Sequence, residues 1–247
     1  MLSEKAVKIS KFDRVPLAEP MTYRVVFRKT GNLQYFSHLD LQRTWQRVLV
    51  RASIPMWYTL GFNPHAKIVF GIPLPVGCEG LCEMVDLRVD RKITAEEMKN
   101  QLNAELTREM AVGEVYVPTT SFNDIVWGTY EIIIRDGDDP AALACRMNAL
   151  LSGNGEPIVM SKRTKSGDKD VDIRPMIRDF SAVPQEDGTV FIRTTLAAGN
   201  TDNLSPEFVV TAVKDALGIL ADIDHPADCW YRILRTGFLT GDGSVFR

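Results

Sequence analysis

The fold is decided by residues 21–52, MTYRVVFRKTGNLQYFSHLDLQRTWQRVLVRA. The run from Met21 to Lys29 is rich in β-branched and aromatic residues, which predicts a strand. Ser37 then predicts the start of a helix that runs to about Ala52, because its hydroxyl can accept a free backbone N–H of the first turn and Asp40 can complete a capping box. The apolar residues of this helix fall on one face, which predicts that the face is buried: Leu41, Trp45, Val48, Leu49 and Ala52.

The chain after this helix completes a first unit. Strands are predicted at 67–72 and 81–89, separated by a segment with Pro73, Pro75 and Gly77. A second helix, capped by Thr94, is predicted at 95–106, and a last strand at 113–117. The order β-α-β-β-α-β is that of a ferredoxin-like unit, with an antiparallel sheet and both helices on one face.

The same order of elements recurs in the second half of the sequence. The pattern predicts a strand at 130–134, a helix at 140–151, strands beginning at 157 and at 189, a helix at 206–217 and a strand at 229–234. We therefore predict an α+β protein of two tandem ferredoxin-like (βαββαβ) units with antiparallel sheets. The units span residues 21–125 and 126–247, with a mobile N-terminal arm at 1–20 and a polar insertion at 161–183.

Composition and charge indicate the class of protein. Charged residues at 25% and hydrophobic residues at 45% are typical of globular proteins. Residues 1–125 carry 16 Lys and Arg against 14 Asp and Glu, whereas residues 126–247 carry 13 against 18. A polyanion is therefore expected to meet a local basic patch in the first half. The sequence shows no secretory signal, no membrane span and no disulfide framework, so we expect a cytoplasmic location.

A row of arginines makes the first helix a candidate nucleic-acid surface. Arg43, Arg47 and Arg51 recur every four residues, roughly opposite the apolar face. Guanidinium groups at this spacing can bond successive phosphates, whereas the alternative is a solvated face with Asp40 as a salt-bridge partner. Other candidate contacts to nucleic acid are Arg28, Asn63, His65, Lys67, Lys162, Arg163, Lys165 and Arg174.

Two histidines are the candidate catalytic residues. His38 opens the predicted helix, where the helix dipole favours a neutral imidazole, and His65 follows Asn63-Pro64 in a predicted turn. Together they could supply an acid and a base for phosphodiester chemistry. The alternative is two structural histidines that bond loop carbonyls. We expect His38, beside the core face, to be mainly structural and His65 to be accessible.

No cofactor and no metal site are predicted. Cys78 and Cys82 have the spacing C-x₃-C without a further cysteine nearby, whereas iron–sulfur and structural zinc sites need about four ligands. Glu83 and Asp86 are three residues apart, which directs them to opposite faces of a strand and makes them a poor catalytic pair. One of them could instead bond an Arg or Lys of an adjacent strand.

Three blocks of sequence carry a resemblance to a known family: FSHLD at 36–40, GFNPH at 61–65 and DIRP at 172–175. They resemble the bacterial radical-SAM-linked proteins, which are fused to a radical-SAM protein or encoded beside one. The resemblance covers about residues 23–236 and implies an accessory role with a radical-SAM partner, but no substrate. It assigns motif positions to Arg28, Ser37, His38, Asp40, Arg43, Gly61, Asn63, His65, Lys67, Glu83, Asp86, Asp172 and Arg174.

These observations lead to three hypotheses of function. The first is a non-catalytic accessory protein that binds RNA and presents it to a radical-SAM partner. RNA is favoured because tandem ferredoxin-like units are similar in architecture to the CRISPR repeat-processing endoribonucleases. In this hypothesis Asn63, His65 and Tyr35 or Phe36 contact bases. The second is a metal-independent, ribonuclease-like enzyme that uses His38 and His65. The third is a protein–protein adaptor that binds no nucleic acid.

Overall fold

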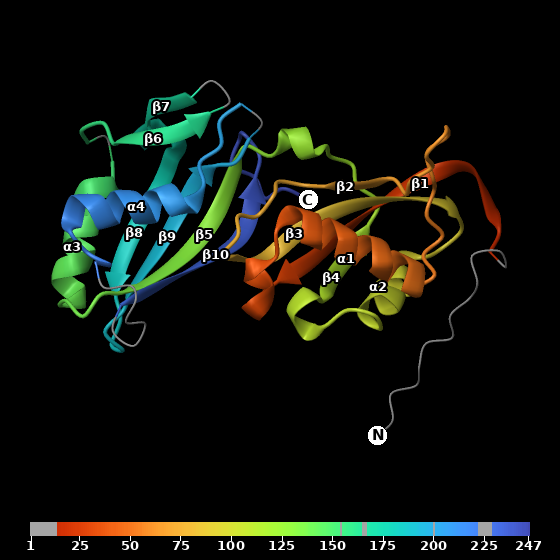
Figure 1. The fold of residues 1–247 in the computed structure, drawn as a ribbon, viewed down its shortest axis with the longest axis horizontal. Helices are drawn as coiled ribbons and strands as arrows, with labels where there is room; N and C mark the ends of the chain where they lie inside the picture. Colours follow the sequence, from red (N-terminus) through yellow and green to blue (C-terminus); the bar gives the residue numbers. More distant parts are fainter. Residues whose placement is uncertain (1–13, 154, 165–166, 200, 222–228) are drawn as a thin grey trace. The chain divides into compact units, whose positions relative to one another are not determined.

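The protein divides into two compact units in the computed structural model, which describes residues 14–153, 155–164, 167–199, 201–221 and 229–247 (Figure 1). Unit 1 consists of Met1–Phe122 with Arg247, and unit 2 of Asn123–Phe246. The division falls three residues before the boundary that the sequence predicts. The fold is mixed α+β, with four α-helices and mainly antiparallel strand pairing among the described residues.

The described residues of unit 1 form four sheet strands and two α-helices. Its strands pair antiparallel in the order β4-β1-β3-β2, so β1 lies between β4 and β3 and the short β2 lies at the edge. The elements in chain order are β1 (Pro16–Lys29), α1 (His38–Arg51), β2 (Ile68–Phe70), β3 (Cys78–Arg91), α2 (Ala95–Asn103) and β4 (Val112–Tyr116).

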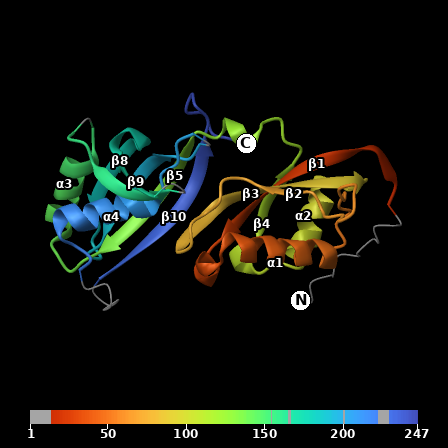
Figure 2. The ribbon, with the colours of Figure 1, turned by 45° about the horizontal axis from the view of Figure 1, so that its top comes forward.

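The core of unit 1 lies between the sheet and its two helices (Figure 2). Every second residue of β1 enters this core, namely Tyr23, Val25 and Phe27, as the period-2 pattern of a strand requires. Trp45 of α1 is fully buried and meets the Phe27 ring edge-on, with 4.9 Å between ring centroids. The predicted apolar face of α1 is buried as expected.

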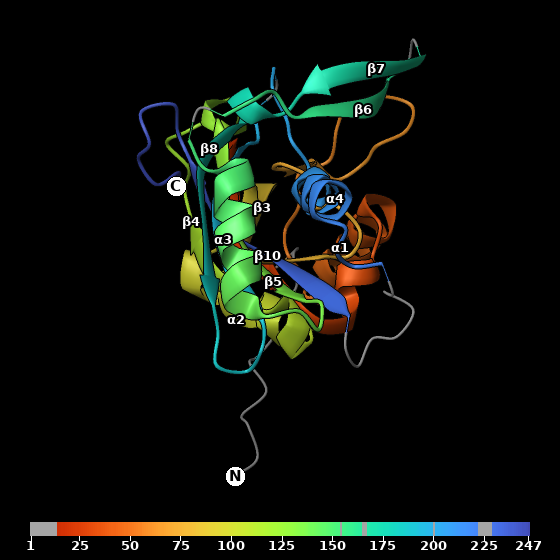
Figure 3. The same cartoon turned by 90° about the vertical axis from the view of Figure 1, so that its left-hand side faces the viewer.

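Unit 2 repeats the arrangement with one addition. Its main sheet has the order β10-β5-β9-β8 with antiparallel pairs, and α3 and α4 lie along one face (Figure 1). The main elements are β5 (Trp127–Arg135), α3 (Pro140–Leu151), β8 (Ile177–Pro184), β9 (Val190–Ala197), α4 (Pro206–Leu217) and β10 (Trp230–Leu239). The addition is a hairpin of β6 (Val159–Thr164) and β7 (Gly167–Asp172), which forms a sheet of its own (Figure 3).

The structure corrects two of the predicted segments. The predicted arm at 1–20 is too long, because β1 already begins at Pro16. Arg14 is also buried and forms an ion pair with Glu97. The predicted insertion at 161–183 is displaced, because β8 from Ile177 onward belongs to the main sheet. The strand expected from residue 157 instead belongs to the β6–β7 hairpin.

None of the helices in the described ranges combines the length and the apolar character that crossing a bilayer requires.

Candidate functional site

The FSHLD block begins α1 with a complete capping box. The Ser37 hydroxyl accepts a hydrogen bond from the backbone N–H of Asp40 (3.2 Å) and donates one to the Asp40 carboxylate (2.6 Å). The backbone N–H of Ser37 donates to the same carboxylate (3.3 Å). Two motif positions of the block therefore hold the start of the helix, as the sequence predicts.

The capping box makes the stability of α1 depend on pH. The hydrogen bond from the Ser37 side chain, more than the nearby Arg43 charge, holds the pKa of Asp40 below its ordinary value, although desolvation opposes this. A carboxyl whose pKa is lowered by folding stabilises the folded state above the ordinary pKa, and this contribution is lost as the pH falls through the lowered pKa. We expect Asp40→Ala to melt at a lower temperature than wild type at neutral pH. In thermal melts at successively lower pH, the difference should shrink as the pH falls through the lowered pKa of Asp40, and a difference that stays unchanged into strong acid would contradict the role of the ionised carboxylate.

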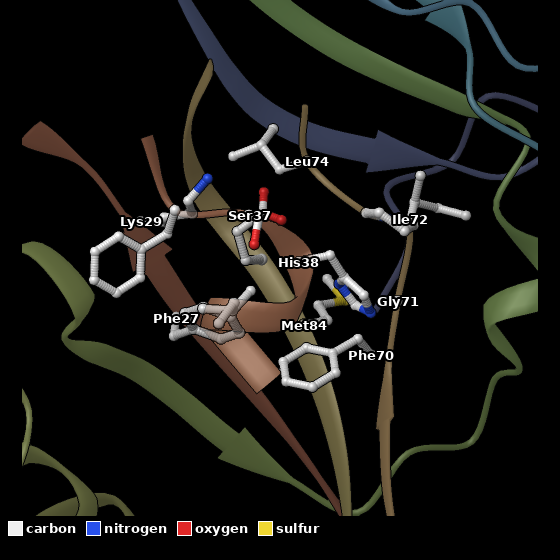
Figure 4. Close-up of a pocket in the computed structure, with 13 residues that line it drawn as sticks. Phe27, Lys29, Ser37, His38, Phe70, Gly71, Ile72, Leu74 and Met84 are labelled. Carbon is white, nitrogen blue, oxygen red and sulfur yellow. The ribbon is translucent and has the colours of Figure 1, made fainter. Parts of the chain in front are cut away.

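A small pocket, here called the α1 pocket, lies beside this helix start (Figure 4). Its volume is about 10 Å³, which is enough for about one water molecule. Lys29 of β1 and Glu83 of β3 line it and are both buried, and the Lys29 ammonium donates to the carbonyl of Gln34 (3.2 Å). The remainder of the lining is largely apolar, with Phe27, Phe36, Leu41, Phe70, Ile72, Leu74 and Met84. The α1 pocket is therefore too small for a substrate and buries two charged groups instead.

Gly80 makes room for the buried carboxylate of the α1 pocket. A Cβ atom added at Gly80 would lie 2.2 Å from Oε1 of Glu83 and 2.8 Å from its carboxyl carbon. Gly80 is also the residue of β3 that pairs with Lys29 of β1. The pairing of β1 with β3 thus brings the two buried charged residues to the same part of the sheet.

Both candidate histidines are exposed. His38 is exposed and lines the α1 pocket, where its ring contacts the Phe70 ring edge-on with 5.4 Å between the ring centroids. His65 is exposed as expected, but its Nδ1 lies 3.1 Å from the Thr59 hydroxyl and 3.2 Å from the Asn63 carbonyl. The His38 ring is not buried as a structural histidine was expected to be, because the helix places residue 38 outside the core face.

The position of His65 along the chain indicates whether both histidines can act on one phosphodiester. The chain from Ala66 to Phe70 is extended and pairs with its neighbours, and five extended residues span about 16 Å. His65 therefore lies far along the chain from Phe70, the residue that His38 contacts. This geometry does not favour one phosphodiester between both rings.

Replacement of each histidine tests this description. His38→Ala should lower the free energy of unfolding by about 0.5–1.5 kcal/mol, the usual worth of an aromatic pair. His65→Ala should leave the melting temperature nearly unchanged and accelerate amide hydrogen exchange at residues 59–65, since its contacts hold only an exposed loop. A large loss of melting temperature for His65→Ala with none for His38→Ala would reverse the assignment.

Residues 57–67 form a hairpin-like loop, here called the Phe62 loop. The N–H of Thr59 donates to the His65 carbonyl (2.9 Å), and that of Lys67 to the Trp57 carbonyl (3.1 Å). Trp57 in turn donates to the carbonyl of Arg88 on β3 (2.8 Å), which attaches the base of the loop to the sheet. Leu60 is 92% exposed at the tip, and Phe62 is fully exposed.

Phe62 was not among the predicted contacts, although the sequence contains a signal for it. The residue stands between Gly61, whose φ is +134°, and the Asn63-Pro64 turn. An aromatic residue inside a turn of this kind has no strand or helix face along which to be buried. Of the aromatic residues that the sequence favoured, Tyr35 is exposed, whereas Phe36 lines the α1 pocket.

The arginine row of α1 is reduced to a pair. Arg43 and Arg47, here called the arginine pair, are exposed, and no hydrogen bond or ion pair to a described residue holds either guanidinium. Arg51 instead forms an ion pair with Glu105 (3.0 Å) and also donates to the Glu105 carbonyl (3.3 Å). The arginine pair is therefore available to a ligand, whereas Arg51 links α1 to the end of α2.

The other basic candidates lie in different surroundings. Arg28 is exposed and donates to the Arg108 carbonyl, and Lys67 is exposed at the base of the Phe62 loop. Lys162 and Arg163 belong to β6, but their side chains lie outside the described part of the structure, as does the whole of Lys165.

The Asp and Arg of the DIRP block hold the chain around the end of α3 by hydrogen bonds to the backbone. Arg174 donates to the carbonyls of Leu150 (2.7 Å), Gly153 (3.2 Å) and Glu156 (2.5 Å) around the end of α3. Asp172 accepts from the N–H groups of Ile158 (2.9 Å) and Arg174 (3.0 Å). These bonds occupy the guanidinium and favour a structural role over contact with a nucleic acid.

The two motif carboxylates of β3 have different partners, in agreement with opposite faces of the strand. Glu83 lines the α1 pocket. Asp86 accepts two bonds from the guanidinium of Arg24 on β1, at 2.8 and 2.9 Å. The four cysteines are free, and the described residues contain no group of three or more His, Cys, Asp or Glu that could hold a metal ion.

Comparison with known proteins places the chain in a family. Residues 22–206 match a family described as an uncharacterized protein conserved in bacteria, DUF2344. The chain belongs to this family. The match to DUF2344 contains the whole of the FSHLD, GFNPH and DIRP blocks and ends at the first residue of α4.

Other comparisons add little to the family. No curated protein shows a significant match to the chain. Among solved structures, the chain is similar to one titled "Crystal Structure of a Cbf5-Nop10-Gar1 Complex", with 11% identity and a TM-score of 0.44. The similarity covers 87% of this chain and 48% of the other, so the chain spans about half of that protein's length. A TM-score this low implies neither a shared fold nor a shared function.

Proposed function

We propose that this DUF2344 protein is a non-catalytic accessory protein that binds RNA through unit 1 and presents it to a radical-SAM partner. The observation that carries the proposal is the arginine pair, two exposed guanidinium groups one helical turn apart that no hydrogen bond or ion pair holds to a described residue. A free guanidinium can donate two parallel hydrogen bonds to the oxygens of one phosphate, so an exposed pair of arginines suits the backbone of a nucleic acid. Arg24 and Arg51 differ from this pair, because a carboxylate holds each of them.

The Phe62 loop supplies the second part of the proposed RNA site. A fully exposed ring can stack on an unpaired base. Asn63 and His65 are exposed beside it and carry hydrogen-bonding groups that suit base edges. We assign phosphates to the arginine pair and bases to the Phe62 loop, and we assign Arg174 to the support of unit 2.

The architecture supports RNA as the ligand. We propose that both units are ferredoxin-like, since each has the element order β-α-β-β-α-β and the corresponding strand order, β4-β1-β3-β2 in unit 1 and β10-β5-β9-β8 in unit 2. Four-stranded sheets of this topology are among the common platforms for single-stranded RNA. The radical-SAM partner and the cytoplasmic location rest on the sequence alone.

The enzyme hypothesis is the second candidate. A ribonuclease that uses His38 and His65 needs both rings at one phosphate, and the extended chain between His65 and Phe70 separates them. The two hypotheses predict different results when a labelled single-stranded RNA is incubated with the protein in excess chelator. An accessory protein binds the RNA, with an affinity that falls as salt rises, and leaves it intact. Cleavage that is lost in both His38→Ala and His65→Ala would favour the enzyme, and absence of salt-dependent binding would favour the protein–protein adaptor.

A further inference from the structure

The main sheet of unit 2 carries a hollow on the face that is turned away from its buried side chains. The hollow has a volume of about 450 Å³, within the usual range for small-ligand sites of about 300–1,000 Å³. Alternate residues of β5 and β9, such as Ile132 and Ile192, are fully buried. The residues between them point to the opposite face, because strand side chains alternate.

The register of the strands places the lining residues in two rows. Thr195 of β9 pairs with Thr129 of β5 and with Asp179 of β8, which forms the first row. Arg193 of β9 pairs in the same way with Glu131 and Ser181, which forms the second row. All six residues line the hollow. Thr236 of β10 also lines it, with its hydroxyl 3.0 Å from that of Thr129.

An apolar row adjoins the second polar row. Phe191 pairs with Ile133 of β5 and Val183 of β8. The guanidinium carbon of Arg193 lies 5.2 Å from the centroid of the Phe191 ring, and the Arg193 side chain is 75% exposed. The guanidinium lies over the ring and is itself exposed, so Phe191 supports a guanidinium plane on which a flat group can stack.

The charges at the hollow are balanced. Arg193 lies 3.8 Å from a carboxylate oxygen of Glu131, and Arg178 lies 3.7 Å from one of Asp179. A paired set of charges does not attract a bare phosphate, and residues 126–247 as a whole carry 13 basic against 18 acidic residues. Hydroxyl and carboxylate oxygens instead accept hydrogen bonds from the hydroxyls of a sugar and from the amino groups of a base.

We propose that this hydroxyl-lined hollow binds the nucleoside part of one unpaired ribonucleotide, with the base on Phe191 and Arg193 and the 2′-hydroxyl at Ser181 and Asp179. The proposal rests on RNA binding by the protein and adds what the arginine pair cannot provide, namely discrimination of RNA from DNA. The arginine pair contacts phosphates, which both nucleic acids have, whereas the 2′-hydroxyl belongs to RNA alone. Unit 1 thus supplies affinity, and unit 2 supplies recognition.

The test compares RNA and DNA oligonucleotides of one sequence on the full-length protein by fluorescence anisotropy. Phe191→Ala should weaken RNA binding by about 5- to 150-fold, the usual effect of removing one stacking partner. Ser181→Ala should bring the RNA-to-DNA affinity ratio closer to one without changing the salt dependence. Ser205→Ala is the matched control, because Ser205 precedes α4 and its hydroxyl makes no capping bond. Far-UV CD confirms that each variant is folded, and Ser181→Ala serves alone if Phe191→Ala does not fold.

The outcomes separate this inference from the proposed function. If wild type binds RNA and both variants keep the wild-type affinity and RNA-to-DNA ratio, the hollow is not a nucleoside site, although the arginine pair still stands. If wild type binds no RNA, the proposed function fails, and a titration with free cytidine, guanosine, adenosine and uridine tests the hollow by itself. NMR shifts at residues 179–195 that Ser181→Ala reduces would then support it, and absence of any shift would overturn it.

Discussion

Charge reversal of the arginine pair, Arg43→Glu with Arg47→Glu, should reduce the affinity for single-stranded RNA by about 100-fold or more. A hydrogen bond to a charged group contributes about 1.5–3 kcal/mol, and the double variant loses two such contacts. Both residues are exposed on α1 and bond no described residue, so the far-UV CD spectrum should remain that of wild type. Anisotropy titrations with a labelled oligonucleotide at several salt concentrations measure the effect.

Neutral replacement of the same pair gives the number of phosphate contacts. The logarithm of the affinity falls with the logarithm of salt by about 0.7 for each phosphate that is neutralised on a single strand. Arg43→Gln with Arg47→Gln should therefore make the slope shallower by about 1.4. Arg51→Gln is the matched control, since Arg51 belongs to the same row but is held by Glu105. Equal RNA affinity in wild type and the charge-reversed variant would show that the arginine pair is only a solvated helix face.

Helix starts could be predicted from the sequence because their signals are local. Ser37 with Asp40 fixes the start of α1, and Asp139 before Pro140 fixes that of α3, where the Asp139 side chain accepts from the N–H of Ala141 (3.1 Å). Each signal acts within three residues of the chain. The predicted bounds of α3, 140–151, are those of the structure.

Strand positions that depend on distant partners could not be predicted as well. Phe180 and Ala182 of β8 face the same side as the buried residues of β9, but exposed Arg178, Asp179 and Ser181 obscure the alternation. The start of β1 was missed because prolines normally interrupt strands. Pro16 is tolerated as the first residue of β1, before a register shift that ends at Met21.

In the candidate site, too, features set by local sequence could be predicted, whereas those that depend on distant residues could not. The arginine row and the accessible His65 follow from helical periodicity and from the Asn63-Pro64 turn. The α1 pocket could not be predicted, because the burial of Lys29 and Glu83 depends on how β1 pairs with β3. The ion pair that occupies Arg51 could not be predicted either, because its partner Glu105 lies 54 residues away in the sequence.

The largest effect on stability is expected at Arg24, which joins three parts of unit 1. This arginine is 1% exposed, and its guanidinium donates to both carboxylate oxygens of Asp86 and to the hydroxyl (2.9 Å) and carbonyl (3.1 Å) of Thr120. It also lies 4.1 Å from the centroid of the Phe122 ring. Removal of one member of a buried ion pair leaves the other charge uncompensated, which costs about 3–5 kcal/mol.

We therefore expect Arg24→Met to lower the free energy of unfolding by about 3–5 kcal/mol in urea denaturation, although methionine keeps most of the apolar stem. Asp86→Leu should cost a similar amount, whereas the double variant should lose much less than the sum, because neither charge is then left alone. Arg88→Met is the matched control on β3. Arg88 is half-buried and its guanidinium lies over the Trp57 ring, 4.9 Å from the ring centroid, a contact worth about 0.5–2 kcal/mol. If the double variant instead lost the sum of the two single losses, Arg24 and Asp86 would have no interaction energy with each other. If Asp86→Leu left stability unchanged and abolished RNA binding, the motif carboxylate would belong to the functional site rather than to the frame that supports it.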